Sequence, residues 1–201
     1  MPKLCLIIKH KEQIMDITRN REYCLTLLHE YTKSDSLLKH AFAVETCVRG
    51  YAEKYNEDLE YWGNVALLHD FDYEKYPTSE EHPFRGAEIL REKGFDEEFV
   101  NSILSHADYS GVPRDTILKK VLFACDELAG FITAVTYVRP SKSVDEVEVS
   151  SVKKKMKDKA FAKAVSRDDI INGAVGIEIQ LDEHIQFCIN AMRNNKELLG
   201  L

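Results

Sequence analysis

The sequence lacks the features that define secreted and membrane-spanning proteins. Its 201 residues contain no Cys-x-x-Cys pair, and the number of cysteines, 5, is odd. A disulfide framework or a zinc knuckle is therefore not expected, and we predict a reduced, cytoplasmic protein. No apolar run reaches the roughly 18 residues that a membrane span needs. Internal repeats, low-complexity segments and interdomain linkers are also missing, so the length predicts one domain.

An excess of positive charge is missing as well. Lysine and arginine number 27 against 34 aspartates and glutamates, which gives a net charge of −7. A protein that coats a nucleic-acid polymer needs a basic face to neutralise phosphates, so this class is disfavoured. A small phosphate-bearing substrate, held by a few local cations, remains compatible with the charge.

Residues 1–16 are predicted to be an N-terminal extension. The apolar piece from Leu4 to Ile8 has basic flanks, but it is too short for the apolar part of a signal peptide. No cleavage site of small residues follows it. The piece is compatible with a short strand or a loose arm, and Met15 with an alternative start.

After residue 16, apolar residues recur with helical spacing almost throughout. Residues 71–83 and 107–115 have turn-rich compositions and are predicted to be loops. The stretch 116–138 is long and strongly apolar, which predicts the central helix of a bundle. The predicted fold is all-α, with residues 17–201 in a single domain. The pattern predicts helices over 18–33, from about 34–36 to beyond residue 51, 59–69, 84–93, 96–106, 116–138, 144–164, 168–174 and 181–199.

Six polar residues stand at core-adjacent positions of these helices or at their ends. They are His40, His69, Asp70, His82, His106 and Asp126. Asp70 directly follows an apolar run, and burying an unpaired carboxylate is costly. A metal ion is one partner that would take imidazole nitrogens and carboxylate oxygens together. Four histidines and two aspartates suffice for two divalent ions if Asp70 bridges them, with positions left for water.

The order H…HD…H…H…D and its flanks resemble the HD superfamily of metal-dependent phosphohydrolases. LLKHAFAV is similar to the family's first-ligand helix, VALLHDFDYEK to its LLHDIG helix end, and ACDELAGF to its last-ligand helix. HPFRGAEIL resembles the helix with an extra histidine found in two-metal members. SHADYSGVP is similar to a loosened form of the HHE..DG.GYP stretch of HD-GYP phosphodiesterases. In that stretch Ala107 replaces the second histidine, and Gly111-Val112-Pro113 replaces Gly-Tyr-Pro, which disfavours cyclic-dinucleotide specificity and a third metal.

The resemblance implies an HD bundle with its core at about 37–135 and C-terminal helices at 144–201. A first divalent ion would be held by four of the six residues, namely His40, His69, Asp70 and Asp126. Asp70 would bridge to a second ion, held by His82 and His106. Fe, Mn, Co, Zn or Mg suit such ligands, and four histidines favour a transition metal over Mg. The implied reaction is hydrolysis of a small, nucleotide-like phosphate ester by a metal-activated water.

Plainer interpretations exist for each residue alone. His40 could be a hydrogen-bonded core histidine, and His82 and His106 could be loop or helix-end residues. Their joint occurrence with the matching flanks favours metal ligands.

Weaker candidates surround this set. Asp72 and Glu74 could orient a ligand histidine, or belong to a solvated acidic loop. Besides Asp70, we expect Arg85 to clamp a substrate phosphate and Glu127 to act as a base or as a hydrogen-bond acceptor that supports a ligand. The remaining candidates are more simply interpreted as surface or structural residues: His10, His29, Lys75, Arg139, Lys142, Lys153–Lys155 and His184.

Three functions remain open at this point. The leading hypothesis is a metal-dependent phosphohydrolase with a small phosphorylated substrate, no nucleic-acid polymer and no membrane as partners. A di-iron oxygenase of the HD fold shares the ligand order and would need two Fe and oxygen. A ligand-sensing HD module without catalysis is disfavoured by the complete ligand set. The sequence leaves the oligomeric state open.

Overall fold

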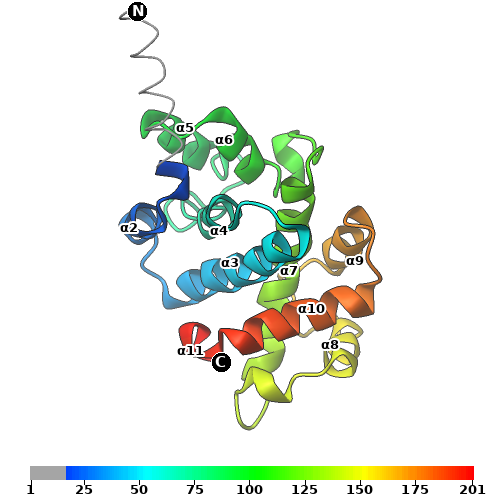
Figure 1. Ribbon diagram of the computed structural model, residues 1–201. Helices are drawn as coiled ribbons and strands as arrows, with labels where there is room; N and C mark the ends of the chain where they lie inside the picture. Colours follow the sequence, from blue (N-terminus) through cyan, green and yellow to red (C-terminus); the bar gives the residue numbers. More distant parts are fainter. Residues whose placement is uncertain (1–16) are drawn as a thin grey trace, which may run out of the picture.

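The computed structural model describes residues 17–201, which are helical and contain no strand (Figure 1). The predicted all-α fold is confirmed, whereas the single-domain assignment stays a prediction. The predicted extension 1–16 lies outside the described residues. Within residues 17–201, no helix is long and apolar enough to cross a membrane. The α-helices are α2 (Arg21–Tyr31), α3 (Asp35–Tyr55), α4 (Leu59–Leu67), α5 (Phe84–Glu92), α6 (Glu97–Leu104), α7 (Ile117–Tyr137), α8 (Val149–Met156), α9 (Arg167–Gly176), α10 (Leu181–Asn194) and α11 (Lys196–Leu199), with short 3-10 turns η1 (Asp108–Ser110) and η2 (Val144–Glu146).

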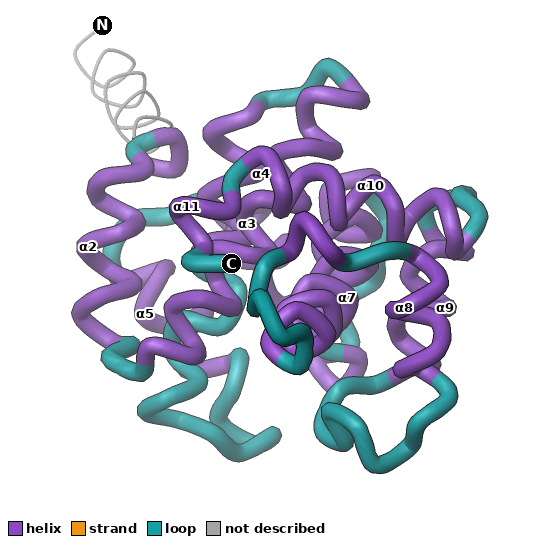
Figure 2. The backbone as a smooth tube through the Cα atoms, turned by 90° about the horizontal axis from the view of Figure 1, so that it is seen from below, coloured by secondary structure: helices purple, strands orange, loops and turns teal. Residues whose placement is uncertain are grey.

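Helix α7 lies at the centre, as its apolar sequence predicted. The Thr116 side chain caps it by accepting a hydrogen bond from the Lys119 N–H. Leu122, Leu128 and Ile132 on α7 are fully buried. Helix α3 packs against α4 and α7, while α9 packs on α7. Figure 2 shows α7 between the α2 and α5 side of the molecule and the pair α8 and α9.

The crossing of α9 over α7 is unusually close because Gly173 has no side chain. A Cβ atom at Gly173 would lie 2.5 Å from the Cα atom of Ala124. That distance is well inside van der Waals contact, so any other residue would push the helices apart. The contact fixes α9 against the part of α7 that carries Asp126.

The prediction of a helix over 144–164 is wrong in its second half. Helix α8 ends at Met156, and residues 157–165 form turns. The Asp158 carboxylate accepts hydrogen bonds from the N–H groups of Ala160 at 3.1 Å and Phe161 at 3.3 Å. The Arg167 guanidinium donates to the carbonyls of Phe161 and Ala162. These side chains take the place of helical backbone partners, which explains why the helix stops.

Several predicted boundaries also shift. Helix α2 begins after Asn20, whose side chain accepts from the Tyr23 N–H at 3.0 Å, and not at Thr18. Ser166, rather than Asp168, caps α9. The predicted helix 181–199 is divided at Asn195 into α10 and α11. The predicted helices 59–69 and 96–106 end earlier, at Leu67 and Leu104, so His69 and His106 lie beyond the helix ends and not within the helices.

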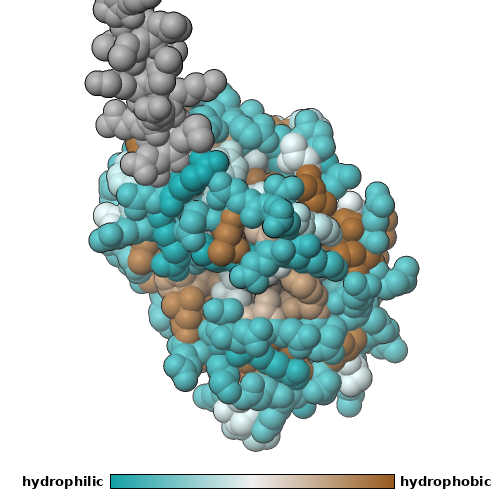
Figure 3. All heavy atoms as spheres, in the orientation of Figure 1, coloured by the Kyte–Doolittle hydropathy of each residue, from teal (hydrophilic) through white to brown (hydrophobic). Residues whose placement is uncertain are grey.

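The face of the molecule drawn in Figure 3 is mostly hydrophilic, with isolated hydrophobic groups. A groove of about 730 Å³ lies between α3 and the C-terminal helices. Its buried Glu45 carboxylate accepts two hydrogen bonds from Arg21, at 2.6 and 2.9 Å. The paired charges make this groove a structural feature, and the candidate site lies elsewhere.

Candidate metal centre

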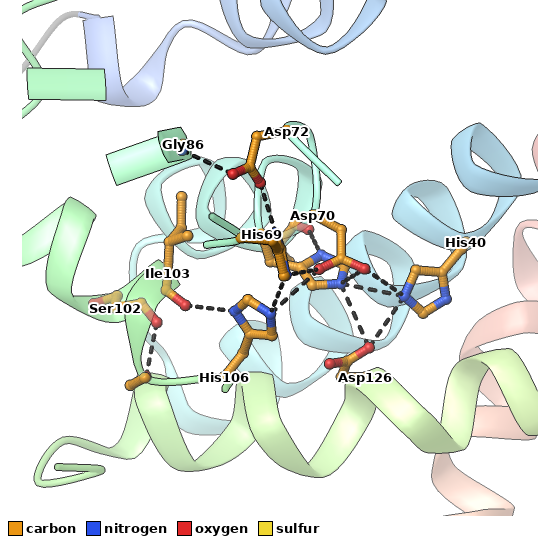
Figure 4. Close-up of polar contacts among 12 residues, drawn as sticks. His40, His69, Asp70, Asp72, Gly86, Ser102, Ile103, His106 and Asp126 are labelled. Atoms are coloured by element: carbon orange, nitrogen blue, oxygen red, sulfur yellow. Dashed lines mark hydrogen bonds and ion pairs between the residues drawn. The ribbon is translucent and has the colours of Figure 1, made fainter. Parts of the chain in front are cut away.

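The structure brings the six predicted ligand residues into one cluster, and Figure 4 labels all of them except His82. His40 comes from α3 and Asp126 from α7, whereas the others follow or precede shorter helices. His69 and Asp70 come directly after α4, and His106 comes after α6. The last member, His82, lies just before α5. Side chains at the ends of separate helices can face a common centre while the helices themselves stay regular.

Asp70 divides the cluster into two groups. Its Oδ2 atom lies 3.8 Å from Nε2 of His40 and 3.6 Å from Nε2 of His69. Its Oδ1 atom lies 3.2 Å from Nε2 of both His82 and His106. One carboxylate therefore presents one oxygen to each of two histidine pairs, as a ligand that bridges two ions must.

Asp126 completes the first group. Its Oδ1 atom lies 3.1 Å from Nε2 of His40 and 3.4 Å from Nε2 of His69. The two Nε2 atoms of this group are 3.2 Å apart, and so are those of His82 and His106. Ligand atoms about 2.1 Å from one ion lie roughly 3.0–3.4 Å from each other at tetrahedral or octahedral angles. The donor set and most of its spacings therefore fit divalent metal ions.

Three of the four imidazoles are held from behind by hydrogen-bond acceptors. His69 Nδ1 donates to the Ala66 carbonyl at 2.7 Å, and His106 Nδ1 donates to the Ile103 carbonyl at 2.6 Å. His82 Nδ1 donates to Oδ1 of Asp72 at 2.8 Å. These bonds keep each ring oriented with Nε2 toward the cluster, as a metal ligand requires.

Asp72 is itself held in place. Its Oδ2 atom accepts a hydrogen bond from the Gly86 N–H at 2.8 Å, and its side chain is buried. A Cβ atom at Gly86 would lie 2.8 Å from Cγ of Asp72, so glycine is needed there. The other acidic candidate, Glu74, accepts from the backbone N–H groups of Lys33 and Ser34 instead. Of the two, only Asp72 touches a histidine of the cluster.

The charges of the cluster act strongly on one another. Burial would lower the pKa of His69, but the negative charges of Asp70 and Asp126 outweigh it and raise that pKa to about 9. Burial would raise the pKa of the Asp70 carboxyl, yet the charge of His69 and hydrogen bonds from His106 and His82 hold it well below its usual range. Asp70 is therefore ionised and attracts cations.

The predicted catalytic residues Glu127 and Arg85 fall in different places. Glu127 lines the cleft over the cluster, and burial, followed by the charge of Asp126, raises its pKa to about 7. Arg85 does not line that cleft, and its guanidinium pairs with Glu88 at 2.8 Å on the surface. The structure thus brings Glu127 to the cluster and leaves Arg85 outside it, in an ion pair that has no contact with the cluster.

A cleft of about 450 Å³ opens over both histidine pairs. Its walls include residues that the sequence did not single out, namely Tyr73, Asp108, Tyr109, Phe123 and Asp169. The Ala66 and Ile103 carbonyls were missed too, since a backbone acceptor leaves no signal in a sequence. Tyr109 lies in the stretch SHADYSGVP, which was the one available pointer to the cleft.

Comparison with known proteins agrees with this geometry. Residues 37–130 match the family model described as HD domain. The matched stretch is just under half of the chain, and it is similar to HD domains. HD domains bind divalent metals and are typically metal-dependent hydrolases. The two histidine groups around Asp70 are compatible with that chemistry.

One curated relative of the chain is a tRNA (cytidine(56)-2'-O)-methyltransferase of Thermoplasma volcanium. It is 33% identical over 103 residues, which are 51% of this chain and 30% of the relative. The chain thus spans less than a third of the relative's length. No solved structure matches the chain.

Proposed function

We propose that the protein is a metal-dependent phosphohydrolase that cleaves a small phosphate ester with a metal-activated water. The two oxygens of Asp70, each directed at a separate histidine pair, are the observation that supports it most. His40, His69 and Asp126 would hold one ion, and His82 and His106 the other. Bound divalent ions supply a water of lowered pKa and offset the charge on phosphoryl oxygens.

The remaining steps belong to the chain's own groups. The Ala66 and Ile103 carbonyls and Asp72 keep three imidazoles oriented, so that the ligand geometry exists before substrate arrives. Glu127 lines the cleft beside Asp126, where its carboxyl can hold a proton for the leaving oxygen of the ester. Arg85 is left out of this scheme because its guanidinium pairs with Glu88.

Metal analysis followed by a substrate panel tests the proposal. We expect two divalent ions per chain in protein purified without a chelating tag, and turnover of a phosphomonoester or phosphodiester under anaerobic conditions. Two Fe with an oxygen-dependent oxidation and no hydrolysis would establish the di-iron oxygenase instead. Bound metal without turnover on any ester would favour a sensing module.

We further propose that a nucleic-acid polymer is not the substrate. The relative's name states that it acts on tRNA, but the chain's net charge is −7 and the cleft walls carry Asp108, Glu127 and Asp169. Such a surface repels a phosphodiester backbone. Filter binding with bulk tRNA at low and at physiological salt should show no retention, and salt-dependent retention would overturn this part of the proposal.

A further inference from the structure

The cleft over the cluster has aromatic walls. Tyr109 is 53% exposed and Tyr73 39%, although large aromatic side chains are usually buried. The Tyr109 ring lies 6.4 Å from that of Phe84, and the Tyr73 ring meets His82 edge-on at 5.2 Å. Aromatic rings held at the mouth of a cleft are a common device for binding a ligand.

Lysine and arginine side chains are absent from the walls of this cleft, as far as residues 17–201 are concerned. Nearby arginines are engaged elsewhere. Arg114 pairs with Asp108 at 2.6 Å and covers the Phe123 ring, and Arg167 donates to backbone carbonyls. A second phosphate group would find no partner here beyond the metal ligands.

Asp169 is the carboxylate that stands out. It lies in the first turn of α9 and lines the cleft, and no ion pair to it exists within the described residues. Asp108, by contrast, is offset by Arg114. The wall formed by α9 therefore carries a negative charge without a protein partner.

The charges of the ions and carboxylates at the site indicate which class of substrate it would bind. Two divalent ions would bring four positive charges, of which Asp70 and Asp126 offset two. A phosphomonoester dianion offsets the other two. Further phosphates, as in nucleoside diphosphates and triphosphates, would lie against Asp169 without a cation. A positively charged group in the cleft would meet the Asp169 carboxylate, and aromatic rings line the same cleft. A carboxylate and an aromatic face are the two partners that bind alkylammonium ions.

We propose that the cleft selects phosphomonoesters whose alcohol part carries an alkylammonium group. Asp169 is the counter-ion of that group, and the face of Tyr109 packs against it. The proposal rests on the proposed phosphohydrolase function for the phosphate end, while the ammonium end is recognised by the cleft walls alone.

Binding to the protein loaded with Zn²⁺ tests the ammonium end separately, because the bound ions offset Asp70 and Asp126, which would otherwise attract a cation themselves. Choline should bind about tenfold more tightly than its uncharged isostere 3,3-dimethylbutan-1-ol in isothermal titration calorimetry. Asp169→Asn should remove the difference. Asp168→Asn is the matched control, since Asp168 shares the first turn of α9 but does not line the cleft, and it should keep the difference. Equal binding of both probes would overturn the proposal.

Turnover by the metal-loaded protein then separates this proposal from the hydrolase. We expect kcat/KM about tenfold higher for phosphocholine than for 3,3-dimethylbutyl phosphate, and a ratio near one in Asp169→Asn. Hydrolysis of both esters at equal rates would overturn the ammonium site and leave the hydrolase standing. Choline binding that depends on Asp169, without hydrolysis of any ester, would support the site and overturn the hydrolase.

Discussion

His69 and His184 are both fully buried, yet their surroundings are opposite in kind. His184 Nε2 donates to the Ala124 carbonyl at 2.9 Å, and its Nδ1 accepts from the Tyr51 hydroxyl at 2.7 Å. Both nitrogens of His184 are thus satisfied as a neutral ring. His69 has only its Nδ1 satisfied, and its Nε2 faces another imidazole and two carboxylates.

The pKa values of the two histidines express this difference. Burial lowers the pKa of His184 below its ordinary value of 6.5, whereas Asp70 and Asp126 raise that of His69 to about 9 in spite of burial. A buried histidine that faces uncompensated carboxylates lies in a place that attracts cations. A buried histidine whose one ring nitrogen accepts a hydrogen bond and whose other ring nitrogen donates one is a structural residue of the core.

The largest effect should follow removal of the bridging carboxylate. Asp70→Ala takes one ligand from each histidine pair, so we expect loss of both ions and a fall in kcat/KM of about 10⁴-fold or more. Elemental analysis and the ester panel measure both. His184→Leu, made in parallel, should keep its ions. Full activity in Asp70→Ala would refute the assignment of the whole site.

A smaller effect should follow loss of the hydrogen bond behind His82. Asp72→Asn cannot satisfy both the His82 Nδ1–H and the Gly86 N–H, so metal affinity at the second ion should fall about 10–100-fold. Competition with a chelator measures this affinity. Glu74→Gln is the control, because Glu74 binds the start of α3 and should leave affinity unchanged. Equal affinities in the two variants would remove Asp72 from the site.

Changing the satisfied histidine should affect stability alone. His184→Leu leaves the Tyr51 hydroxyl buried without a partner and removes the second hydrogen bond of the Ala124 carbonyl, which should lower the free energy of unfolding by about 1–3 kcal/mol. Urea denaturation of the metal-loaded protein measures it. A loss of bound metal in this variant would contradict the contrast between the two histidines.

The smallest expected effect is the change in the free energy of unfolding with pH that His184 causes. Its folded pKa lies below 6.5, so the unfolded chain takes up the proton first, and stability is present above pH 6.5 and lost as pH falls below it. The slope should approach about 1.4 kcal/mol per pH unit. The facing groups, the Cys188 thiol, the Tyr51 hydroxyl and the more distant Lys54, keep their charge in this range. The difference between wild type and His184→Leu between pH 7 and 5 measures the slope, and parallel curves would rule it out.

The six clustered residues could be predicted from the sequence, whereas the groups that hold them in place could be predicted only in part. The all-α fold, the central helix and the order of the six clustered residues follow from apolar spacing and from resemblance to the HD family. Asp72 was one of two equal candidates, because spacing alone does not tell which carboxylate reaches His82. The tertiary contact with Gly86 decides it.

Other failures have local causes. Residues 157–165 carry enough helix-forming residues to predict a helix, but Asp158 and Arg167 bind the backbone in its place. Arg85 lies in the HPFRGA turn, near enough to His82 in the sequence to suggest a phosphate clamp, yet its guanidinium pairs with Glu88 on α5. Both errors come from interactions of side chains whose direction a sequence pattern does not specify.

The close packing of Gly173 on Ala124 has a consequence for how such proteins diversify. It attaches α9 firmly to the ligand-bearing helix, although α9 lies outside the residues 37–130 that match the HD family. The proposed counter-ion Asp169 thereby comes from a different stretch of chain than the candidate metal ligands. Exchanging the segment after residue 156 between HD proteins should therefore transfer preference for the alcohol part of an ester while leaving the metal ligands untouched.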